Sequence, residues 1–107
     1  MATPKSPPSP PPGWSMDPEE LDYETDWAPG DGGGYQIGLE YNLGECIPLM
    51  CDPFGSEVIF TAGGKFYEWN QLADSVHQIV FPTTLDEIIT VMKEEGRRGL
   101  KWKKLRA

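Results

Sequence analysis

The sequence predicts an α+β fold, a small antiparallel sheet of four to five strands with one C-terminal helix packed on one face. Three observations predict it: short β-prone runs alternate apolar with polar residues, two of these runs flank a glycine turn, and a capped amphipathic helix follows the last run. We expect the compact domain to span residues 33–96. It lies between a disordered Pro-rich and acidic arm, residues 1–32, and a basic tail, residues 97–107.

The first two strands are predicted from alternation and from a proline. Residues 35–41 place apolar side chains at every second position, which is typical of a strand with one face on a core. Residues 45–50 form a second extended run, in which Pro48 indicates an edge strand or a bulge because it cannot donate to a ladder. Residues 52–55 then predict a turn.

The remaining strands include a hairpin. Residues 56–60 and 65–69 are β-prone runs, and the four residues between them, 61–64, predict a short loop. Residues 76–81 form a further strand candidate.

One helix is predicted after Pro82. Thr84 and Glu87 have the spacing of a capping box, in which each side chain satisfies the other residue's backbone N–H. Apolar residues then recur at i, i+3, i+4 and i+7 and form one stripe, and Gly96 is the expected stop. The stripe consists of Leu85, Ile88, Ile89 and Met92.

The N-terminal arm combines two compositions. Six prolines within residues 1–13 favour extended polyproline II structure. Residues 16–31 contain seven acids and no base, interrupted by Leu21, Tyr23 and Trp27, so this part either packs back on the domain or folds on a partner.

Charge is distributed unevenly along the chain. Residues 1–95 hold all 17 acidic residues and three lysines, a net charge of −14, whereas the last twelve residues hold six cations and no acid. An acidic body repels phosphate backbones, so nucleic-acid binding would depend on the tail alone. No run is long and apolar enough to cross a bilayer and no secretory signal is visible, so we expect a cytoplasmic protein.

The potentially reactive side chains are few. Cys46 and Cys51 are expected as thiols that contribute to packing, and together with the single histidine, His77, they do not make a typical zinc site. His77 has no nucleophile beside it in a catalytic pattern, and the glycines of residues 30–34 lack the Lys-Ser/Thr of a P-loop. The sequence therefore predicts no enzyme, no cofactor and no metal.

Parts of the chain resemble a known family. Residues 55–60, residues 64–69 with their Tyr67 and Trp69, and residues 81–89 are similar to the glycine-led strand, the "g-k-V-Y-x-W" strand and the final helix of the SUKH superfamily. The resemblance extends over residues 27–92 and concerns the C-terminal half of that fold. It implies a non-catalytic binding scaffold, used mainly by immunity proteins that neutralise toxins.

We therefore expect a non-catalytic protein-binding module, an acidic immunity-type protein that masks a basic toxin or nuclease. Two alternatives stay open: a small structural or accessory subunit of a larger assembly that uses the Pro-rich arm and basic tail, and a nucleic-acid-binding accessory factor that acts through the tail. The oligomeric state and the partner are not predicted. The candidate partner-binding residues are aromatic or charged: Trp27, Tyr35, Tyr67, Glu68, Trp69, Arg97, Arg98, Lys101, Trp102, Lys103 and Lys104.

Overall fold

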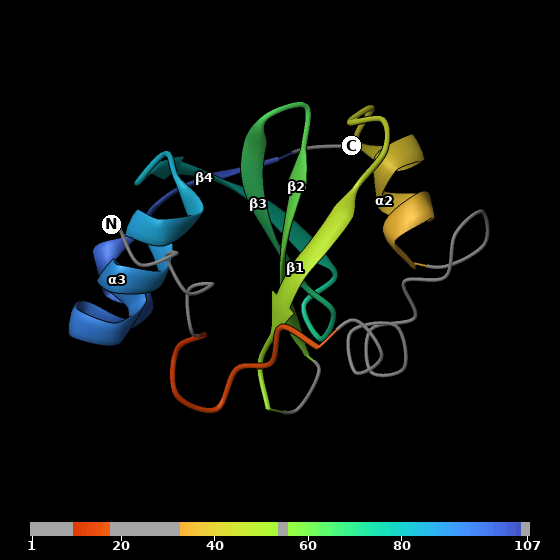
Figure 1. Ribbon diagram of the computed structural model, residues 1–107. Helices are drawn as coiled ribbons and strands as arrows, with labels where there is room; N and C mark the ends of the chain where they lie inside the picture. The colour runs from red at the N-terminus through yellow and green to blue at the C-terminus, as the bar shows by residue number, and fades with distance from the viewer. Residues whose placement is uncertain (1–9, 18–32, 54–55, 106–107) are drawn as a thin grey trace, which may run out of the picture.

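The chain forms a five-stranded antiparallel sheet with one helix on each face (Figure 1). The computed structural model describes residues 10–17, 33–53 and 56–105. Strands that follow one another in sequence are neighbours in the sheet, so the order is β1-β2-β3-β4-β5. The predicted antiparallel sheet with a C-terminal helix is confirmed. The strands are β1 (Ile47–Cys51), β2 (Glu57–Ala62), β3 (Lys65–Asn70), β4 (Ser75–Phe81) and β5 (Lys101–Lys104).

The centre of the fold is β2, in which Val58, Ile59 and Phe60 are fully buried in succession. Because side chains alternate between the two faces of a strand, three consecutive buried residues require cover on both faces. One core lies under α3 (Leu85–Glu95) and contains Ile59. The other lies under α2 (Gly33–Glu40) and contains Val58 and Phe60.

Helix α3 begins as the sequence predicts. The Thr84 hydroxyl accepts a hydrogen bond from the Glu87 backbone N–H, which caps the first turn. Ile88, Ile89 and Met92 are buried against the sheet, and Gly96 ends the helix with a φ of 69°. None of the helices within the described ranges has the length and apolarity to cross a bilayer.

The predicted strand over residues 35–41 is wrong, because most of this segment is helix α2. Its C-terminus has the hydrogen bonds of a Schellman motif: the Leu43 N–H donates to Gly38 O and the Asn42 N–H to Leu39 O. Asn42 has the positive φ, 56°, that this motif places just after a helix. In the helix Ile37 is buried while Leu39 is 63% exposed, so the two residues do not share the face that alternation assigned to them.

The hairpin of β2 and β3 is confirmed, but its loop is shorter than predicted. Thr61 and Ala62 belong to β2, and Ala62 pairs with Lys65, which leaves a two-residue turn of Gly63 and Gly64. Both glycines have positive φ, 57° and 80°, as a type I′ turn requires.

Strand β1 lies at one edge of the sheet, as Pro48 predicts. The register between β1 and β2 shifts between Pro48 and Met50, so this edge also carries the expected irregularity. Its outer side is met by Ser15, which exchanges two backbone hydrogen bonds with Cys51. This contact belongs to the part of the N-terminal arm that is described, residues 10–17; the rest of the arm lies outside the described residues.

The basic segment is not a tail beside the domain but part of the sheet. After α3 the chain makes a 3-10 turn, η1 (Gly96–Gly99), and returns as β5, antiparallel to β4. Leu100, between them, is 3% exposed and lies in the core under α3. Cations hid this role in the sequence, although Leu100 and Trp102 pack against the core under α3 and Leu105 packs against the core under α2.

Shortening Ile59 should destabilise the protein, whereas the same change at the sheet edge should not. We expect Ile59→Val to lower the free energy of unfolding by about 1 kcal/mol, and Ile47→Val, at a half-exposed site of β1, by less than about 0.5 kcal/mol. Urea denaturation followed by circular dichroism measures both values. Equal losses would contradict the placement of the core.

Removal of residues 97–107 should unfold the chain or lower its unfolding midpoint sharply, because it removes β5 and the buried Leu100. A control in which Lys101 and Lys103 become Gln keeps the strand and removes only charge. We expect this control to keep the wild-type thermal midpoint. A truncated chain as stable as the full one would show that β5 is dispensable.

Candidate partner-binding site

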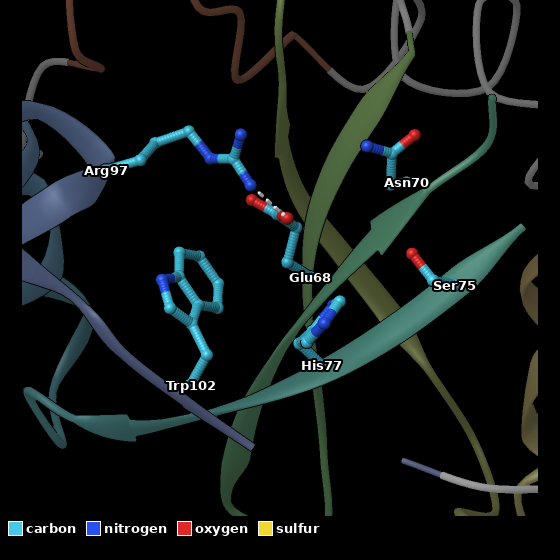
Figure 2. A pocket seen from close by; sticks show the side chains of 6 residues that line it. All are labelled: Glu68, Asn70, Ser75, His77, Arg97 and Trp102. Atoms are coloured by element: carbon cyan, nitrogen blue, oxygen red, sulfur yellow. Dashed lines mark hydrogen bonds and ion pairs between the residues drawn. The ribbon is translucent and has the colours of Figure 1, made fainter. Parts of the chain in front are cut away.

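A shallow pocket of about 180 Å³ lies on the α3 side of the sheet, where β3, β4, β5 and η1 meet. Figure 2 shows its side chains converging from these elements. Six residues line it: Glu68, Asn70, Ser75, His77, Arg97 and Trp102.

Strand register brings the charged members of this site together. Glu68 of β3 is paired with His77 of β4, and His77 with Lys104 of β5. Ile59 occupies the next position of the same row, on β2. The row therefore changes from an apolar side chain on β2 to ionisable side chains on β3, β4 and β5.

Arg97 joins the pocket to two strands. Its Nη1 donates to Glu57 Oε1 at 2.8 Å and its Nη2 to Glu68 Oε1 at 2.5 Å. Glu57 also belongs to the sheet face under α3, since it precedes Ile59 by two residues on β2. One guanidinium thus ties η1 to β2 and β3.

Glu68 is the buried charge of this site. Its residue surface is 1% exposed, and its Oε2 atom has no hydrogen-bond partner among the described residues. Burial raises the pKa of Glu68 to about 7; Arg97 opposes this shift, and the nearby carboxylates of Glu57 and Asp52 add to it. Near neutral pH this carboxyl group therefore exists in both protonation states.

The aromatic wall of the pocket is Trp102. The guanidinium carbon of Arg97 lies 5.4 Å from the centroid of the Trp102 ring, within the range of a cation–π contact. The His77 ring meets the same indole edge-on, with centroids 6.2 Å apart. Burial lowers the pKa of His77, and Lys104 and Arg97 lower it further, so all three favour the neutral imidazole.

Ser75, His77 and Glu68 line one pocket, which invites comparison with a hydrolytic triad. A triad requires hydrogen bonds from the hydroxyl to the imidazole and from the imidazole to the acid. Neither bond is made among the described residues, and the acid is bonded to Arg97 instead. The geometry is suited to hydrogen bonding and charge recognition.

The structure separates the predicted partner-binding residues into groups. Glu68, Arg97 and Trp102 meet in the pocket. Tyr67 is buried on the opposite face, stacked on Phe60, and Trp69 packs against the same core, so both contribute to stability. The other cations of the predicted set lie along η1 and the sheet edge: Arg98, Lys101, Lys103 and Lys104. Tyr35 falls in α2, and Trp27 lies outside the described residues.

Sequence reasoning missed His77, Asn70 and Ser75 as members of this site. The sequence indicates no site for His77, because the pairing of β4 with β3 is not visible in it. A signal was present nonetheless. Glu68 and Asn70 are two residues apart, as are Ser75 and His77, so each pair shares one face of its strand around a tight turn.

The two cysteines do not form a site with His77. Cys51 is buried on the α2 side of the sheet, and Cys46 packs at the margin of the same core, while His77 faces the α3 side. Burial raises the pKa of the Cys46 thiol. No cluster of three or more His, Cys, Asp or Glu side chains suited to a metal occurs among the residues the structure describes.

Comparison of the chain with protein-family models, with curated proteins and with solved structures found no match.

The raised pKa of Glu68 should make stability fall as pH rises. The folded state holds a proton on Glu68 up to about pH 7, whereas the unfolded chain loses it near the ordinary value of 4.5. Between these values the folded state binds more protons, so this group's contribution becomes less favourable as pH rises, by up to about 3 kcal/mol, and is constant above pH 7.

We expect Glu68→Gln to remove this slope, so that the variant gains stability relative to wild type between pH 5 and pH 8. Urea denaturation at a series of pH values measures it. Glu94→Gln, which also removes one carboxyl group but from the exposed side of α3, is the control. Parallel curves for Glu68→Gln and wild type would contradict the assignment.

Proposed function

We propose that the protein is a non-catalytic protein-binding module of the acidic immunity type, and that its partner is basic. The observation that carries this proposal is the buried carboxylate of Glu68, which lines an open pocket and has one oxygen, Oε2, without a hydrogen-bond partner in the described structure. A buried polar atom of this kind destabilises the fold unless something supplies the missing donor.

A basic side chain is the donor best suited to this position. The carboxylates of Asp52, Glu57 and Glu68 outnumber the two cations that act on the pocket, Arg97 and Lys104. Arg97 is 44% exposed at its side chain, and Figure 2 shows it beside the Glu68 carboxylate. A lysine or arginine of the partner reaches Oε2 as the Arg97 side chain shifts, and the Trp102 ring offers the incoming cation a second contact.

The outward side of α3 extends the acidic surface. Four of its acids are exposed against the single cation Lys93: Asp86, Glu87, Glu94 and Glu95. An acidic field of this kind accelerates encounter with a basic protein and makes the rate sensitive to salt. The resemblance of residues 27–92 to the SUKH superfamily supports the same function, because it implies a scaffold for masking toxins.

The nucleic-acid alternative is supported by one observation, the three exposed lysines of β5. They are fixed in the sheet beside an acidic body. The experiment below therefore includes nuclease-treated extract, which removes proteins held only through nucleic acid.

We expect the immobilised full chain to retain a basic protein from nuclease-treated native extract at low salt, and to release it as salt is raised. Glu68→Gln should weaken this binding by about tenfold or more, because it removes a charged acceptor, whereas Glu94→Gln should change it less than about twofold. Titration calorimetry with the purified partner measures the affinities. Partners that are acidic, or equal affinities for the two variants, would refute the proposal.

A further inference from the structure

The free edge of the sheet is β5. Strand order ends there, and its outer backbone groups pair with no other strand in the described structure. Such an edge can accept one more strand through main-chain hydrogen bonds. Lys101, Lys103 and Lys104 on this edge are exposed, so the edge selects its partner by charge.

The two faces of β5 differ in character. Lys101 and Lys103 share the face toward α2, whereas Trp102 and Lys104 share the face toward α3. A second β5 would place lysine opposite lysine, which is destabilising. Pairing of two β5 strands is therefore disfavoured, whereas a strand with acids at every second position is favoured.

The sequence contains such a strand pattern. Acids occupy positions 20, 22, 24 and 26, and the intervening positions hold Leu21, Tyr23, Thr25 and Trp27. Extended, this segment has one acidic face and one face of largely apolar residues. An antiparallel pairing of Tyr23 with Trp102 would set Glu24 opposite Lys101 and Asp22 opposite Lys103.

The anchor at Ser15 favours a second copy of the chain over the same molecule as the source of this segment. Ser15 is held at the outer side of β1, at the far edge of the sheet, by its backbone bonds to Cys51. Five residues from Ser15 to Glu20 reach at most about 18 Å. Ser15 lies one strand spacing outside β1, and a strand added to β5 would lie one spacing outside β5. Six spacings, about 29 Å along the sheet, therefore separate these two positions, and α2 and α3 cover the faces of the sheet.

We propose that the β5 edge binds residues 20–27 of a second copy of this chain as a sixth, antiparallel strand. The exchange is reciprocal, so two copies form a two-fold symmetric dimer in which each acidic segment neutralises the partner's lysines. This dimer does not depend on the basic partner proposed above; its edge adjoins the Glu68 pocket, since Trp102 of β5 also lines that pocket.

The test is a charge exchange followed by sedimentation velocity of the full chain. We expect wild type to dimerise at low ionic strength and to dissociate at about 500 mM salt. One variant carries Lys101→Glu and Lys103→Glu, and the other carries Asp22→Lys and Glu24→Lys. Each alone should raise the dimer dissociation constant at least about tenfold, because two attractive pairs become repulsive.

An equimolar mixture of the two variants should restore the dimer as a heterodimer. In it the acidic β5 of one variant faces the basic segment of the other, and the basic β5 of the second faces the acidic segment of the first. All the changed β5 side chains are exposed, and circular dichroism confirms that each variant is folded. A wild type that stays monomeric at low salt overturns the proposal. So does a mixture that fails to associate, an unchanged dimer in either variant, or a monomer whose β5 lysines bind only nucleic acid.

Discussion

The fold depends on the burial of β2 on both of its faces. Val58, Ile59 and Phe60 are consecutive and inaccessible, so the sheet is stable only as the middle layer between α2 and α3. The core under α3 extends to Ile79 of β4 and Trp102 of β5. The polar pocket lies beside this core, because Trp102 also lines the pocket, and the position of the site is thus a consequence of the core.

Within that pocket a single arginine has two tasks. It compensates part of the charge of Glu68, and it connects the turn after α3 to β2 and β3. Compensation is incomplete: the pKa of Glu68 is raised, and its Oε2 has no hydrogen-bond partner among the residues that the structure describes. An arrangement of this kind sacrifices some stability in the isolated protein and leaves electrostatic energy that a partner can use.

Local signals predicted much of this structure. The Thr84 cap of α3, the glycine turn of the hairpin and the edge position of Pro48 each depend on chemistry within a few residues, and all three are present; of the predicted capping box, the structure shows the hydrogen bond from the Glu87 N–H to the Thr84 hydroxyl. Two predictions were wrong because the pattern of apolar and polar residues alone does not determine the structure. Residues 35–41 have the spacing of a strand, although Asn42 can adopt the positive φ that ends a helix. Residues 101–104 form a strand, although three of the four are lysines. The pocket could not be assembled in full, because it depends on the register between β3 and β4 and on the return of Arg97 across the sheet.

The blocked outer side of β1 limits how large an assembly this sheet can build. Pro48 has no N–H to offer, and Ser15 occupies the end of the strand near Cys51. Growth by strand addition is therefore one-sided. In the proposed reciprocal dimer the open edges of both molecules are used at once, so the association stops at two copies and does not continue into a filament. The two edges of the sheet thus limit aggregation.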